Sequence, residues 1–167
     1  MAAGNTFSQI ASTTLGSAAA SVTFSSIAGT YTDLVLVTSI NEPSTGTVFI
    51  QVGNGSVDTA ANYSRTFIYG DGSSAVSGRG SSLNQLYGIA ATATSSFAAG
   101  ITQFMNYSNT TTNKTILFRS NNASAVTVAS VGLWRSTSAI NTIKIYADGA
   151  AVFTAGSTFN LYGISAA

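Results

Sequence analysis

Few side chains in this sequence could carry chemistry: its 167 residues include five acidic residues, six basic residues and no His or Cys. The sequence therefore lacks the usual general base, the cysteine nucleophile and the common zinc ligands. Paired carboxylates could still hydrolyse a glycosidic bond. The acids, however, are scattered and form no motif: Asp33, Glu42, Asp58, Asp71 and Asp148. We predict that the chain is not an enzyme and has no catalytic residues.

Two short segments resemble fragments of ion-binding or phosphate-binding loops. Asp71-Gly72-Ser73-Ser74 matches the start of a calcium loop but lacks the further acids and the terminal Glu. Gly78-Arg79-Gly80 lacks the Lys and the following helix of a phosphate-binding loop. An Asp followed by Gly is a common turn former, which explains Asp71 without a ligand. We expect no metal site and no cofactor.

Aromatic side chains offer a second kind of chemistry, because an aromatic ring can stack on a sugar. The candidates for contact with a glycan or with another subunit are Tyr63, Tyr107, Trp134 and Tyr162. The same residue types are also common in protein cores and subunit interfaces, and this interpretation is the favoured one. The segments 70–82 and 106–114 are the predicted loops in which a glycan contact would lie.

The elements that must position these residues have a β pattern. Short segments rich in Val, Ile, Thr, Phe and Tyr alternate with clusters of Gly, Ser, Asn and Asp. The apolar run 34–37 predicts a central strand covered on both faces. Other segments place apolar residues on one face only: Val48/Ile50/Val52, Phe67/Tyr69, Ile116/Phe118, Val126/Val128/Trp134, Ile143/Ile145 and Phe159/Leu161.

Turn signals separate these segments. Asn54-Gly55, Asp71-Gly72 and Asp148-Gly149 are typical of tight hairpins, and 42–46 is a further turn. About nine to eleven short strands predict an all-β, single-domain antiparallel β-sandwich that is jelly-roll-like, with a small barrel as the alternative. We expect one domain over residues 1–167, with residues 1–6 as a mobile N-terminal arm.

The amino-acid composition limits the kinds of partner that the chain is expected to bind. Charged residues make up only 7% of the chain and its net charge is +1, which argues against binding nucleic acid through phosphate contacts. No apolar run is long enough to predict a membrane span. A chain that is 45% hydrophobic and so poorly charged has a surface that tends to associate. We expect a subunit that buries much of its surface against neighbours.

Four segments carry a family resemblance: 31–36, 62–65, 106–115 and 155–164, of which the ending Gly-Ser-Thr-Phe-Asn-Leu-Tyr-Gly-Ile is the most specific. In this order they resemble small virion structural proteins of tailed bacteriophages, particularly those of cyanophages and other aquatic phages. The resemblance implies a virion component and supplies no catalytic residue.

Two functions follow as expectations. The first is a capsid decoration or cement protein on the outside of the shell, a homotrimer that binds the major capsid protein and stabilises the capsid. The alternative is a small tail fibre, baseplate or receptor-binding subunit, located on the tail, whose partners are other tail proteins and host surface glycans.

Overall fold

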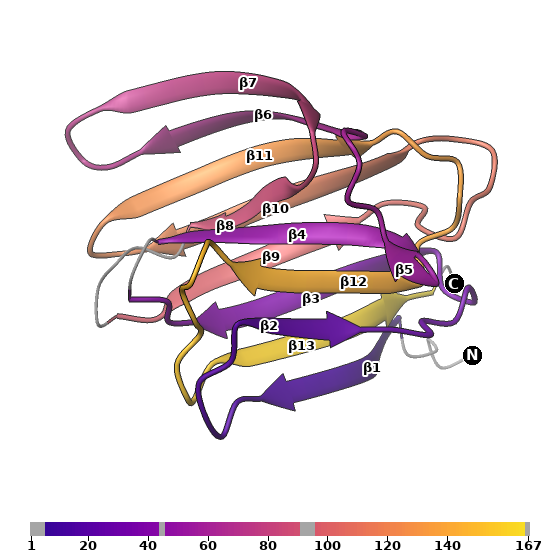
Figure 1. Cartoon of the computed structure of the whole chain (residues 1–167), viewed down its shortest axis with the longest axis horizontal. Coiled ribbons are helices and arrows are strands. Elements are labelled where there is room, and N and C mark those ends of the chain that lie inside the picture. The colour runs from indigo at the N-terminus through magenta and orange to yellow at the C-terminus, as the bar shows by residue number, and fades with distance from the viewer. Residues whose placement is uncertain (1–5, 44–45, 91–95, 166–167) are drawn as a thin grey trace.

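The computed structural model describes residues 6–43, 46–90 and 96–165, and these ranges contain thirteen strands and no helix. The strands form two open sheets that pack face to face (Figure 1). This arrangement confirms the predicted all-β, jelly-roll-like antiparallel sandwich rather than a small barrel. The described residues contain no helix with the length and hydrophobicity needed to cross a membrane.

The larger sheet has eight strands, and every neighbouring pair is antiparallel. In spatial order they are β1 (Phe7–Thr14), β13 (Thr158–Ile164), β3 (Asp33–Ile40), β9 (Ala98–Phe104), β10 (Lys114–Asn122), β11 (Val126–Trp134), β6 (Tyr63–Gly70) and β7 (Ala75–Leu83). The two edge strands are therefore β1 and β7.

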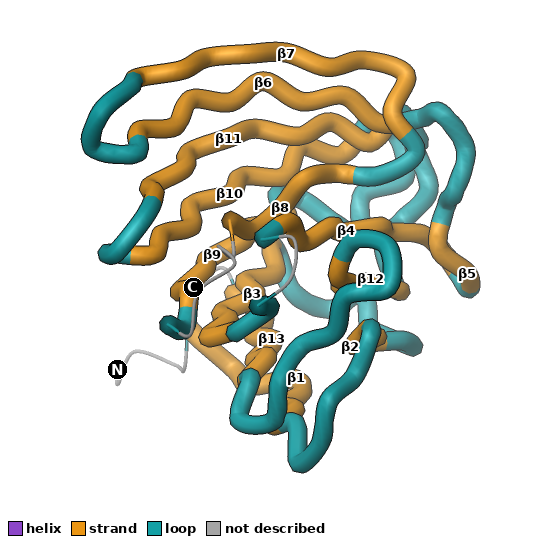
Figure 2. Tube along the Cα trace, turned by 60° about the vertical axis from the view of Figure 1, so that its left-hand side comes forward, coloured by secondary structure: helices purple, strands orange, loops and turns teal. Residues whose placement is uncertain are grey.

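The smaller sheet has five strands. Its central strand β4 (Thr47–Asn54) pairs with β12 (Thr142–Ala147), which pairs in turn with β2 (Ser21–Phe24). Along its other edge, β4 pairs with β5 (Ser56–Val57) and with β8 (Leu86–Ala90). The larger sheet extends past this edge, so that β6 and β7 form an overhang, which Figure 2 shows clearly.

The core lies between the sheets. In most strands alternate residues are buried, as the sequence pattern predicts, whereas β4 is buried along most of its length. Residues with no exposed surface include Leu34, Leu36, Phe104 and Ile116 from the larger sheet and Ile50, Ile143 and Ile145 from the smaller. Fully burying such a side chain contributes about 1.5–3 kcal/mol. This shared cluster holds the two sheets together.

Glycine lets two layers approach closely at one point. A Cβ on Gly132 of β11 would lie 2.8 Å from the Leu86 side chain of β8 and 3.0 Å from the Phe118 ring. Because Gly132 has no side chain, β8 can pack directly on the larger sheet. This contact fixes where the smaller sheet ends and the overhang begins.

Several local predictions need correction. The segment 70–82 is mostly strand, because only residues 71–74 separate β6 from β7. The run 34–37 lies in a central strand, and Leu34, Val35 and Leu36 are buried, but Val37 is 36% exposed, so the described residues cover the outward side of β3 only in part. Residues 1–5 of the predicted arm lie outside the described residues, and the Thr6 carbonyl accepts a hydrogen bond from Ser165 N at 3.0 Å.

Candidate functional site

The four aromatic residues singled out from the sequence lie in two different environments. Tyr63, Tyr107 and Trp134 are 0%, 0% and 3% exposed, so they belong to the core and are not available to a glycan or another subunit. Tyr162 is half-buried on β13 and meets the ring of Phe7 edge-on at 6.4 Å. Of the four, only Tyr162 can take part in a surface contact.

Tyr63 and Trp134 share a hydrogen-bonded network centred on Asp58. Trp134 Nε1 donates to Asp58 Oδ2 at 2.8 Å, and the Tyr63 hydroxyl lies 2.8 Å from the Asp58 carbonyl oxygen and 3.0 Å from that of Val52. Burial alone would raise the pKa of Asp58. The hydrogen bonds from Trp134, Asn62 and Ala60 N together have a larger, opposite effect, so the pKa of Asp58 lies below its usual value. Asp58 therefore organises the core.

The loop 106–114 is anchored in a similar way. The Tyr107 hydroxyl donates to the Ala28 carbonyl and accepts a hydrogen bond from Tyr31 N at 3.3 Å. Lys114 Nζ donates to the Thr112 and Thr137 carbonyls at 2.7 and 3.2 Å. This segment is the predicted loop, but its aromatic ring points into the protein.

Three of the other four acids also have structural partners. Asp33 Oδ1 accepts a hydrogen bond from Asn106 N at 2.5 Å, and Glu42 Oε2 accepts one from Gly46 N at 2.6 Å. Asp71 Oδ1 accepts hydrogen bonds from Ser73 N and Ser74 N, which lower its pKa. Within the described ranges, no three acidic side chains gather closely enough to hold a metal ion.

A first candidate surface is the side of the larger sheet that faces away from the smaller one. We define the outer face by the exposed apolar residues of successive strands: Phe7, Tyr162, Val37, Ile101, Leu117, Val131 and Ile68. Val37 pairs with Ile101, and Leu117 pairs with Val131, so these side chains are neighbours across the strands. Ile68 and Val131 are 60% and 40% exposed.

The outer face is hollowed and carries positive charge. A hollow of about 480 Å³ lies over β9, β10, β11 and β6, and Leu117, Arg119 and Val131 are among its lining residues. Arg119 pairs with Ile101 and Ala129, and this cross-strand row, 37–101–119–129–68, contains no acid. An exposed sheet face in a soluble sandwich is normally polar, so this one has the character of an interface.

A second candidate surface lies on the overhang, on the inward side of β6. The row Leu36–Thr102–Phe118–Ser130–Phe67 crosses the sheet from β3 to β6. Leu36, Thr102 and Phe118 are buried beneath the smaller sheet, whereas Phe67 lies beyond its edge and is only half-buried. The same face therefore changes from core to surface along one row.

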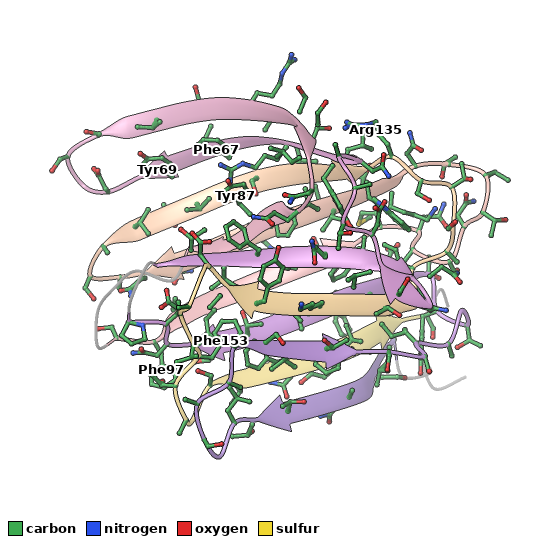
Figure 3. All side chains as sticks on the ribbon, viewed as in Figure 1. Phe67, Tyr69, Tyr87, Phe97, Arg135 and Phe153 are labelled. Carbon is green, nitrogen blue, oxygen red and sulfur yellow. The ribbon has the colours of Figure 1, made fainter. Side chains whose placement is uncertain are left out.

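Four residues on this side form what we call the aromatic ledge: Arg65, Phe67 and Tyr69 of β6, and Tyr87 of β8. The rings of Phe67 and Tyr69 are nearly parallel, with centroids 6.2 Å apart and planes at 10°. The guanidinium carbon of Arg65 lies 4.2 Å from the Phe67 centroid and 3.8 Å from that of Tyr87. Figure 3 shows the three rings along one side of the molecule.

The smaller sheet continues this surface. The ring of Tyr87 meets that of Phe49 edge-on at 4.7 Å, and Phe49 packs against Tyr146 at 5.4 Å. The Tyr146 hydroxyl donates to Gln85 Oε1 at 2.5 Å, and Lys144 Nζ lies 5.0 Å from the Tyr146 centroid. Burial, with a smaller contribution from the Asp148 charge, raises the pKa of Tyr146 to about 12.

Arg65 is the unusual member of the ledge. Its guanidinium contacts two rings, yet no hydrogen bond or ion pair joins it to any other described residue. Burial lowers the pKa of Arg65, and no carboxylate contributes to the shift. An arginine stays protonated at neutral pH, so Arg65 presents a cation with unused donors at the protein surface.

Sequence reasoning placed Phe67 and Tyr69 on one face but did not select them as site residues. The signal that could have found them is the alternation Arg65-x-Phe67-x-Tyr69, opposite the glycines of β7. Phe67 pairs with Gly78, whose missing side chain leaves room for the ring. No sequence pattern identifies Tyr87 as a site residue, because its position beside Arg65 depends on how β8 packs on the larger sheet.

The chain matches no protein-family model, and no curated protein sequence matches it. The functional argument therefore depends on the two surfaces, the outer face and the aromatic ledge.

Proposed function

We propose that this chain is a structural subunit of a phage virion, and that it acts as a capsid decoration protein that binds the outside of the shell and stabilises it. The observation that carries the proposal is the outer face, an exposed apolar surface built across most of the larger sheet. Large apolar patches on a folded protein mark sites of protein association.

Both the sequence and the outer face suggest that a partner covers the outward side of the larger sheet. The run 34–37 is apolar on both sides, as in a strand that is covered twice. Leu34 and Leu36 are buried on the inward side. On the outward side Val35 is 5% exposed and Val37 is 36% exposed, so the uncovered part of the run is at Val37. In the proposal, the major capsid protein provides the second cover.

The charge of the outer face favours an acidic partner. Arg119 lies among apolar residues in a row without an acid. A carboxylate on the capsid protein opposite Arg119 would pair with it and fix the docking orientation. Repetition over many capsid sites would add avidity to a modest contact at each site.

A homo-oligomer, in particular a trimer, is part of the proposal. The low charge of 7% and the exposed Phe7 beside Tyr162 at the β1 edge support self-association. Native mass measured by light scattering tests this part. A mass equal to one chain at assembly concentrations would contradict it.

The experiment that tests the main proposal is the copy number of this protein in purified virions, measured by quantitative mass spectrometry against the major capsid protein. We expect near parity with the capsid protein or a simple fraction of it. A small number of copies per virion would favour a tail component. Absence from virions would overturn both functions.

The second candidate function is a small tail subunit that contacts host glycans. The observation that favours it is the aromatic ledge, in which partly exposed rings share one surface with a cation that has no ion pair among the described residues. The buried Tyr63, Tyr107 and Trp134 do not contribute to it.

A further inference from the structure

We propose that the aromatic ledge binds an acidic saccharide, with the Tyr69 ring packing against a sugar and Arg65, held over Phe67, pairing with the carboxylate of a hexuronate unit. The inference deepens the second candidate function and rests on it for the biological source of the saccharide. The binding site itself is argued from the geometry of the ledge.

The rings provide the stacking surface. Phe67 and Tyr69 occupy alternate positions on β6, and their rings are parallel, with centroids 6.2 Å apart and planes at 10°. Arg65 lies over the Phe67 ring, so a sugar would pack on the Tyr69 end of this platform. The apolar C–H face of a pyranose packs on such a surface, and the tyrosine hydroxyl remains at its rim for hydrogen bonding. Both rings are already half-buried, so their mobility is reduced before the sugar arrives.

The backbone around the platform is rigid. Phe67 rests over Gly78 of β7, because a Cβ on Gly78 would lie 2.6 Å from the tip of its ring. Phe67 also pairs across the strands with Ser130 of β11. The platform is therefore built on paired strands rather than on a loop, and it is preorganised for binding.

Arg65 determines the charge of the ligand. Its guanidinium is held between the rings of Phe67 and Tyr87, with no carboxylate partner among the described residues. Stacking on two rings fixes the guanidinium plane while its N–H groups keep their hydrogen-bonding capacity. A planar fork of donors matches a carboxylate, which is the group that distinguishes a hexuronate from a neutral hexose.

Lys144 adds positive charge farther along the same surface. It lies over the Tyr146 ring, which connects through Phe49 to Tyr87. Asp148 is the acid that acts on this end, since its charge contributes to the raised pKa of Tyr146. The Arg65 end therefore carries the more favourable potential for an anion, and we assign the carboxylate to that end.

The test uses the full chain and oligosaccharides of mannuronate, glucuronate and galacturonate, each beside its neutral hexose counterpart. Saturation-transfer NMR detects binding, and calorimetry gives the dissociation constants. We expect at least one uronate to bind about tenfold or more tightly than its neutral counterpart, and to transfer saturation from aromatic protons.

Matched variants separate the site from the fold. Arg65→Met should abolish the preference for the uronate, whereas Arg79→Met should preserve it. Arg79 is a suitable control because it pairs with Thr66 and so projects from the opposite face of the same hairpin. If Arg65→Met fails to fold, Arg65→Lys keeps the charge and should weaken uronate binding by removing the planar fork.

Three results would overturn the inference: no saccharide of the panel binds, neutral and acidic counterparts bind equally, or Arg65→Met keeps the preference. Binding of an acidic peptide without any uronate binding would also overturn it. None of these results depends on the copy number in virions, so failure of this inference is distinguishable from failure of either proposed function.

Discussion

The inward face of the eight-stranded sheet has two halves that share one alternating residue pattern but differ in how far their side chains are buried. Beneath the smaller sheet, Leu36 and Phe118 are core residues with almost no exposed surface. On the overhang, Phe67 lies in the same cross-strand row but remains half-buried. An inward-facing aromatic residue therefore becomes core or partly exposed surface according to the width of the opposite sheet.

The largest expected contrast between the halves concerns their aromatic side chains. Trp134→Ala should lower the free energy of unfolding by about 3–5 kcal/mol, because it removes a buried ring and leaves Asp58 without its indole donor. Tyr69→Ala on the overhang should cost about 1 kcal/mol or less, because its ring is only half-buried. Urea unfolding of both variants measures the difference. Equal losses would show that the overhang is packed as tightly as the core.

Two glycines provide a smaller contrast. A Cβ on Gly132 would meet Leu86 and Phe118 inside the sandwich, so Gly132→Ala should cost about 1–3 kcal/mol through overpacking. A Cβ on Gly78 would meet only the far end of the Phe67 side chain, which can shift without moving the backbone of the hairpin. We expect Gly78→Ala to cost less in thermal unfolding. A larger loss of stability for Gly78→Ala than for Gly132→Ala would contradict the idea that side chains on the overhang can rearrange more easily than those in the core.

The elements that sequence patterns predicted well are those with clear alternation. Ile143 and Ile145 are buried while Lys144 and Tyr146 are not, as the period of two requires. The turns at Asn54-Gly55 and Asp71-Gly72 also have glycines at positive φ, at 79° and 86°. Both signals are local, so one sequence suffices to read them.

The candidate surfaces were harder to predict because they depend on contacts between distant segments. Strand β7 is rich in Ser and Gly and lacks an apolar face, so nothing in its own residues identifies it as the partner of β6. Residue type makes Trp134 and Tyr63 candidates for a glycan or subunit contact as well as for the core, which is the favoured interpretation, and their polar atoms find partners at Asp58 and Val52 inside the fold. Residue type alone does not distinguish a buried hydrogen-bonded ring from an exposed one.

Alkaline pH should weaken the contact between the smaller sheet and the ledge. Burial and the Asp148 charge raise the pKa of Tyr146 from 10.0 to about 12, so the fold favours the protonated phenol. This contribution is complete below pH 10 and is lost as the pH rises through about 12. Tyrosinate absorbance and urea unfolding across this range measure both effects. Tyr146→Phe should unfold with a shallower dependence on alkaline pH, and an unchanged dependence would contradict the assignment.

The smallest effect on stability is expected on the outer face, where the largest effect on assembly should occur. Leu117→Asp should change the free energy of unfolding by no more than about 0.5 kcal/mol, because Leu117 is 38% exposed and lies on the side of the larger sheet that faces away from the smaller sheet. The same change places a carboxylate in an apolar interface and beside Arg119, where it would compete with the proposed carboxylate of the capsid protein. Rebinding to capsids stripped of this protein should therefore fall sharply. Thr23→Asp, at an exposed position of β2 on the smaller sheet, serves as the control and should rebind normally. Normal rebinding of Leu117→Asp would leave the outer face without its proposed partner, and a large loss of stability would place Leu117 in a packed region instead.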